Sequence, residues 1–119
     1  TTFIQEGAAE AMNLPETMKD VEAMHDEFAR RRKLMMDGLD RIPKLSYVAP
    51  HGAFYIMVDV SKNGMTGEEF AEKLLYEKYV ATVPAICLGS HCGDFVRFSF
   101  AADEEKIREG LKRIEEFLK

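Results

Sequence analysis

A single arginine, Arg97, lies inside an otherwise apolar run near the end of the chain, Phe95 to Phe100 (FVRFSF). Runs of this composition form β-strands, in which successive side chains point to opposite faces. Arg97 is therefore expected on the face opposite Val96 and Phe98. A guanidinium on a largely buried sheet needs an anionic partner, because an unpaired buried charge is very costly. Its planar fork of N–H donors matches the two oxygens of a carboxylate, so the pattern indicates carboxylate recognition.

The residues alone leave three interpretations of Arg97 open. In the first, Arg97 belongs to an edge strand and points into water. In the second, it is structural and forms an ion pair with Asp59 or Asp94. In the third, it binds the carboxylate of a ligand.

Two other sets of reactive side chains are weaker candidates. Cys87, His91 and Cys92 offer three zinc ligands, but a structural zinc site needs a fourth ligand and a more usual spacing. We interpret the two cysteines as buried thiols beside an exposed histidine. Ser99, His91 and Asp94 are close in sequence, yet no nucleophile elbow accompanies them.

The composition is typical of one soluble domain of 119 residues. A net charge of −5 argues against nucleic acid as a partner, because such proteins present a basic face. The basic run Arg30 to Lys33 is flanked by acidic residues, which predicts a salt-bridged, solvated helix face. No membrane span and no signal peptide are expected from the apolar runs. The scarcity of cysteine suits a reducing cytoplasm, which is the predicted location.

Periodicity and breakers predict an α+β fold, a small, mainly antiparallel sheet covered by helices in the order α-α-β-β-α-β-β-α. We expect helices over 1–12, 15–41, 66–78 and 103–118, and strands over 44–48, 53–60, 80–83 and 95–101. Thr66 and Glu69 form a capping box, and Asp103 caps the last helix. The long helix is expected to be amphipathic, because apolar residues recur mostly every three to four positions along it: Val21, Met24, Phe28, Met35, Leu39 and Ile42.

Two motifs together resemble a known family. Pro50 to Tyr55 (PHGAFY) and the arginine-bearing strand resemble the C-terminal small domain of fold-type I, class I/II pyridoxal-phosphate-dependent aminotransferases, of the aspartate aminotransferase kind. Thr2 to Met12 resembles the segment that joins the large and small domains of that family, and Glu104 to Leu118 its terminal helix. Pro84-Ala85 and Leu88-Gly89 depart from the Pro-Gly and Phe-Gly of the family pattern, which affects the expected substrate preference.

The resemblance implies a division of the chain and a role for one residue. Residues 1–14 would be a remnant of the connecting segment, and residues 15–119 the small domain. Arg97 would bind the α-carboxylate of the substrate. The substrates would be an amino acid, aspartate-like or from a broad range, and a 2-oxo acid.

The resemblance also implies what this chain lacks. Pyridoxal 5'-phosphate would be bound by the large domain, because no lysine here has the surroundings of the family's Schiff-base lysine. The parent enzyme would be a homodimer, and this chain alone would be inactive and prone to self-association. Two other functions remain open: a stand-alone module that binds a small anion, and the small domain of a related C–S lyase or synthase.

Overall fold

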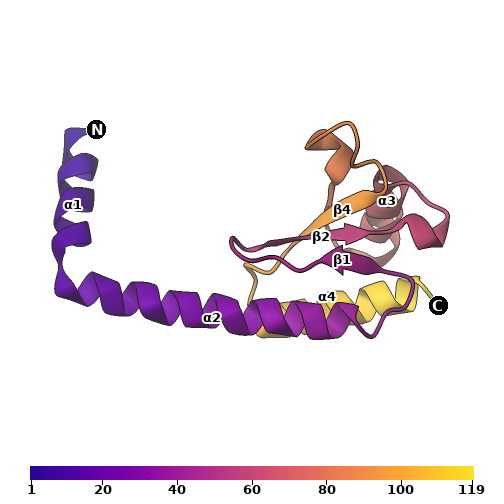
Figure 1. The fold of residues 1–119 in the computed structure, drawn as a ribbon, viewed down its shortest axis with the longest axis horizontal. Coiled ribbons are helices and arrows are strands. Elements are labelled where there is room, and N and C mark those ends of the chain that lie inside the picture. The colour runs from indigo at the N-terminus through magenta and orange to yellow at the C-terminus, as the bar shows by residue number, and fades with distance from the viewer.

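Four helices and a four-stranded antiparallel sheet form the fold in the computed structural model, which describes residues 1–119 (Figure 1). The α-helices are α1 (Thr2–Asn13), α2 (Pro15–Leu39), α3 (Gly67–Lys78) and α4 (Glu104–Phe117). The strands are β1 (Ser46–Val48), β2 (Tyr55–Asp59), β3 (Val83–Pro84) and β4 (Phe95–Ser99), with short 3-10 helices η1 (Ser61–Asn63) and η2 (Ala85–Cys87). The predicted α+β class and element order are confirmed.

The strands are arranged in the order β1-β2-β4-β3, and every neighbouring pair is antiparallel. The long pairing is between β2 and β4, where Met57 lies opposite Arg97 and Tyr55 opposite Ser99. On its other side, β4 pairs with β3, where Val83 lies opposite Arg97. The strand that carries the arginine is therefore an interior strand.

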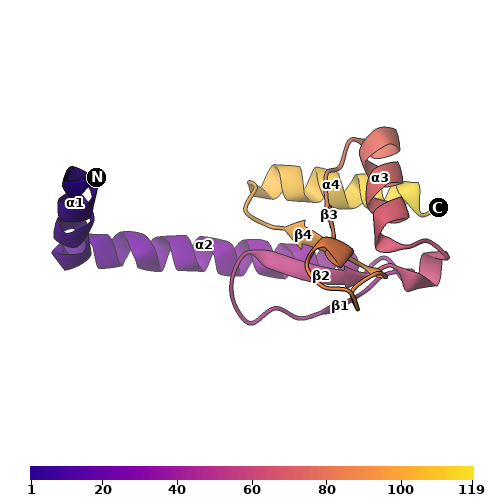
Figure 2. The ribbon, with the colours of Figure 1, turned by 90° about the horizontal axis from the view of Figure 1, so that it is seen from above.

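The hydrophobic core lies between one face of the sheet and helices α2, α3 and α4, as the two ribbon views show (Figures 1 and 2). The sheet contributes buried residues from alternate positions of β2 and β4, because side chains in a strand alternate between faces. The helices contribute one apolar stripe each, including Leu39, Phe70 and Leu111. The other face of the sheet holds only half-buried or exposed residues, and Val48 there is 68% exposed. We call it the open face.

The N-terminal part of the chain extends away from this core. Helix α1 has no buried residue, and α2 buries only Met35 and Leu39, near its end. Val21 and Met24 are 41% and 54% exposed, so the N-terminal part of the predicted apolar face is not covered within this chain. The reason is that α4 covers only the C-terminal part of α2, while α1 contacts only its first turn (Figure 1).

Several element ends differ from the prediction for identifiable reasons. Ala53 takes a left-handed φ of 57°, which removes it from the strand and makes β2 begin at Tyr55. Helix α3 ends at Lys78 as predicted, where Tyr79 also takes a left-handed φ, of 56°. The predicted strand 80–83 is reduced to Val83–Pro84, because only these residues pair with β4.

The predicted helix caps are confirmed. Thr66 accepts a hydrogen bond from the Glu69 N–H at 3.2 Å, and Glu69 accepts one from the Thr66 N–H at 2.9 Å. The Asp103 carboxylate accepts from the Lys106 N–H at 2.9 Å. These bonds satisfy backbone N–H groups that have no partner within the helix. None of the four helices has the length and apolar character needed to cross a bilayer.

Candidate functional site

Arg97 lies in the middle of β4, on the open face of the sheet, and is half-buried. Its neighbours across the sheet are Met57 on β2 and Val83 on β3. The interpretation of Arg97 as an edge-strand residue is therefore wrong. The predicted alternation is confirmed, since Val96 and Phe98 are buried on the opposite face.

The guanidinium of Arg97 makes no hydrogen bond and no ion pair within the chain. Asp59, one of its two predicted partners, accepts instead from the Ser61 N–H at 2.8 Å and the Ser46 hydroxyl at 3.3 Å. These bonds, that from the Ser61 backbone above all, lower the pKa of the Asp59 carboxyl below its ordinary value. Asp94, the other, is exposed and makes no side-chain contact of this kind. The predicted structural ion pair does not form.

The other half-buried arginines of this chain are used differently. Arg31 donates to the Ala101 carbonyl at 3.1 Å, Arg32 to the Pro50 carbonyl at 2.6 Å, and Arg113 to the Lys78 carbonyl at 3.3 Å. Each of them joins two segments of the fold through a backbone oxygen. Arg97 alone among the half-buried arginines keeps its N–H donors free of the protein, which is what binding an external carboxylate requires.

The closest side-chain partner of Arg97 is an aromatic ring. The Arg97 Cζ lies 4.2 Å from the centroid of the Tyr55 ring, a cation–π contact. This contact was not predicted from the sequence. The alternation of side chains along the two strands could have indicated it, because Tyr55 and Arg97 become diagonal neighbours on one face once β2 and β4 are paired.

The hairpin motif brings its own residues to the same region. Pro50 is fixed by Arg32 of α2, and the chain turns at Ala53 before entering β2. The Phe54 ring then packs on Tyr55, with centroids 4.4 Å apart. His51 is exposed and makes no side-chain hydrogen bond.

The remaining sequence candidates do not form a site. Cys87 and Cys92 are free thiols, and the prediction that both are buried is wrong, since Cys87 is exposed and Cys92 half-buried. No group of three or more potential metal-ligating side chains comes together. Cys87 ends the short helix η2, and Cys92 lies in the loop that leads from η2 to β4.

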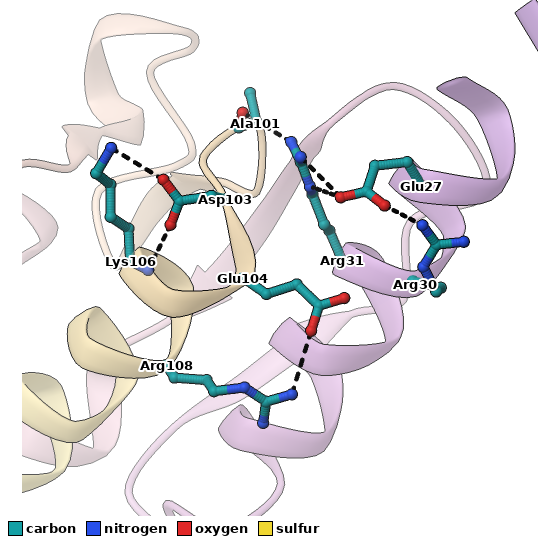
Figure 3. Close-up of polar contacts among 8 residues, drawn as sticks. All are labelled: Glu27, Arg30, Arg31, Ala101, Asp103, Glu104, Lys106 and Arg108. Atoms are coloured by element: carbon teal, nitrogen blue, oxygen red, sulfur yellow. Dashed lines mark hydrogen bonds and ion pairs between the residues drawn. The ribbon is translucent and has the colours of Figure 1, made fainter. Parts of the chain in front are cut away.

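The basic run of α2 is confirmed as a salt-bridged helix face (Figure 3). Arg30 and Arg31 both pair with Glu27, and Lys33 pairs with Asp37 at 2.6 Å. The hydrogen bond from Arg31 is the main cause that lowers the pKa of the Glu27 carboxyl. Figure 3 also shows Arg31 reaching Ala101, in the segment that connects β4 to α4.

The lysines of the chain lie apart from the strand that carries Arg97. The nine lysines all lie outside the four strands, so none is on the open face beside Arg97. All except the half-buried Lys78 are exposed. Arg97 is therefore the only basic side chain that the four strands carry.

The chain matches the sequence model of "Aminotransferase class I and II" over residues 1–114. It is 41% identical to an aspartate aminotransferase of Pyrococcus abyssi, over 99% of this chain and 30% of the relative. It is 37% identical to an aromatic-amino-acid aminotransferase of Thermococcus litoralis, over 99% of this chain and 30% of that protein. The chain thus spans about three-tenths of the length of these relatives.

The likeness extends to solved structures. The fold superposes on the crystal structure of an aromatic aminotransferase from Pyrococcus horikoshii with a TM-score of 0.94. That match has 40% sequence identity and covers 98% of this chain and 31% of the other. The half-buried arginine without a protein partner, the hairpin beside it and these matches lead to one conclusion: the chain belongs to the class I and II aminotransferases.

Proposed function

We propose that this chain is the small-domain part of an aminotransferase and that Arg97 binds the α-carboxylate of its substrates. The observation that carries this proposal is the free guanidinium fork on an interior strand, in a chain whose other half-buried arginines are all bound to carbonyl oxygens. A bidentate arginine–carboxylate pair fixes both the position and the plane of the substrate. The proposed role of this chain is therefore orientation.

The rest of the site is proposed to lie outside these 119 residues. Pyridoxal phosphate supplies the electron sink of amino-group transfer, and the lysine that binds it would belong to the large domain. Residues 1–14 would connect that domain to the small domain, residues 15–119. We further propose a homodimeric parent enzyme in the cytoplasm, where the free thiols Cys87 and Cys92 would stay reduced.

The proposed substrates are an amino acid, aspartate-like or from a broad range, and a 2-oxo acid. Support comes from the relatives, which include an aspartate aminotransferase and an aromatic-amino-acid aminotransferase. Assays of the full-length protein with L-aspartate and L-tyrosine as donors would decide between these classes.

The carboxylate role is tested by Arg97→Lys in the full-length enzyme. Lysine keeps the charge but loses the planar fork, so KM for both the amino acid and the 2-oxo acid should rise roughly tenfold or more. Arg108→Lys is the matched control, because Arg108 forms an exposed pair with Glu104 on α4 and should leave KM unchanged. Equal KM values for wild type and Arg97→Lys would contradict the proposal.

A second test asks whether the lysine that binds the cofactor lies in the large domain, outside these 119 residues. Borohydride treatment of the full-length protein should fix the cofactor on a lysine outside residues 1–119, identified by peptide mass mapping. The purified 119-residue chain should show no transamination. A transamination signal from this chain that Arg97→Ala abolishes would refute this placement.

A further inference from the structure

Tyr55 and Arg97 lie on the same face of the sheet, in cross-strand pairs that are two residues apart along the strands. Tyr55 is opposite Ser99, and Arg97 is opposite Met57, so the two side chains are diagonal neighbours across β2 and β4. Diagonal neighbours are within reach of each other when both side chains are long. Here the Arg97 Cζ lies 4.2 Å from the centroid of the Tyr55 ring.

We propose that Tyr55 is a positioning residue for Arg97: the face of its ring holds the guanidinium in place before a carboxylate arrives. This inference rests on the proposed function of Arg97. Tyr55 itself would not touch the reacting atoms. Its effect would pass through the orientation of the arginine fork.

A ring is a suitable support because it attracts the guanidinium without occupying its donors. The attraction acts on the flat face of the cation, and the N–H groups point outward from its edge. A carboxylate partner would hold Arg97 equally well, but it would use the donors that the substrate needs. Arg31 illustrates the contrast: it lies 5.7 Å from the Phe28 ring and is also bound to Glu27.

The Tyr55 ring also contacts a second aromatic ring. Phe54 packs against Tyr55 with centroids 4.4 Å apart, and Phe28 of α2 stacks on Phe54 at 5.9 Å. The aromatic series Phe28, Phe54 and Tyr55 thus connects the helix α2 to Arg97. Ordering a long side chain in advance removes part of the entropy that binding would otherwise lose.

The expected kinetic signature follows from where the contact acts. The carboxylate itself does not react, so most of the binding that it gains from the arginine fork is present in the ground state as well as in the transition state. Loss of such binding raises KM and leaves kcat nearly unchanged. Removing the ring should raise KM for the amino acid and the 2-oxo acid alike, by about threefold to tenfold.

The experiment uses the full-length holoenzyme with L-aspartate, L-tyrosine and 2-oxoglutarate as probes. Tyr55→Phe keeps the ring and should leave KM within about twofold of wild type, whereas Tyr55→Leu should show the full increase. Tyr55→Met serves as a second ring-less variant if Tyr55→Leu does not fold, and thermal melting verifies the fold of each. Tyr76→Leu, an exposed tyrosine on α3, is the control and should change nothing.

A double-mutant cycle shows whether Tyr55 acts through Arg97. In an Arg97→Gln background the effect of Tyr55→Leu should largely disappear, because the cation that the ring attracts is gone. The inference is overturned if Tyr55→Leu leaves KM unchanged, if Tyr55→Phe is as impaired as Tyr55→Leu, or if the penalty is the same in both backgrounds. If Arg97→Lys itself has no effect on KM, the proposed function fails as well, so the two failures are distinguishable.

Discussion

Gly67 donates its backbone N–H to the Gly93 carbonyl at 2.7 Å, and a Cβ on Gly67 would collide with the carbonyl oxygen of Phe95. The first residue of α3 is thus pressed against the start of the arginine-bearing strand β4. The obstacle is backbone, which cannot move aside as a flexible side chain can. This contact sets how closely α3 approaches the sheet.

Gly67→Ala should therefore destabilise the protein, by about 2–3 kcal/mol, because helix and strand must separate to make room. Gly110→Ala is the matched control, since Gly110 lies inside α4 and a Cβ there would meet nothing within 4 Å. That control should stabilise the protein by about 0.5–1 kcal/mol through helix propensity. Urea denaturation of both variants measures the two changes. Similar free energies of unfolding for both would refute the close contact.

Tyr79→Gly should stabilise the protein by about 1 kcal/mol, because Tyr79 ends α3 with a left-handed φ of 56° that glycine adopts without strain. The side chain is 80% exposed, so little packing is lost. Tyr76→Gly provides the opposite case in the same helix, at an exposed interior position, and should destabilise by about 0.5–1 kcal/mol. Thermal melting of the two variants shows whether each is more or less stable than wild type. A melting temperature of Tyr79→Gly below that of wild type would contradict the prediction.

The Asp103 cap should make stability depend on pH on the acid side. Hydrogen bonding to the Lys106 backbone N–H lowers the pKa of the Asp103 carboxyl below its ordinary value of 3.8. A carboxyl whose pKa is lower in the folded protein stabilises it above the unfolded pKa, and this contribution is lost as the pH falls through the folded pKa. The contribution should therefore be complete near pH 5 and decline below 3.8.

Asp103→Ser separates capping from titration, because serine caps a helix without ionising in this range. Its melting temperature should fall less than that of wild type between neutral and acid pH. Asp103→Ala should melt lower than both at neutral pH, since it removes the cap. If the melting temperature of Asp103→Ser depends on pH as that of wild type does, Asp103 does not contribute to the loss of stability in acid.

The exposed apolar residues of α1 and the start of α2 should cause the 119-residue chain to self-associate. This patch consists of Phe3, Ile4, Met12, Leu14, Met18, Val21 and Met24, all of them exposed. Exposed apolar side chains in this number are unfavourable in water and promote association. In the parent enzyme, the large domain is the proposed cover for this patch. Light scattering should show a molecular mass that rises with concentration.

Charged substitutions within the patch test that expectation. The double variant Val21→Glu with Met24→Glu should shift the chain toward the monomer, because association would then bury two carboxylates. Leu75→Glu, at an exposed position on α3 outside the patch, is the control and should leave the association unchanged. A wild-type chain that is monodisperse and monomeric at high concentration would refute the prediction.

Much of the local structure could be predicted from the sequence because its causes lie within a few residues. The Thr66–Glu69 capping box and the Asp103 cap depend on side chains three positions from their partners. The alternation around Arg97 follows from the geometry of any strand, whatever its neighbours. The hairpin motif and the arginine strand also identified the family, since both lie in short, recognisable segments.

Other features were decided only when distant segments packed together. Whether Arg97 lay at an edge or inside the sheet depended on strand order, and the order β1-β2-β4-β3 arises from pairing between residues about 40 positions apart. The Tyr55 ring beneath Arg97 follows from that pairing. The exposure of Val21 and Met24 has the same origin, because an apolar helix face is buried only where another element covers it. The sequence by itself determined which faces are apolar and where one arginine interrupts them, and the tertiary structure decided which of those faces are covered and what lies beside that arginine.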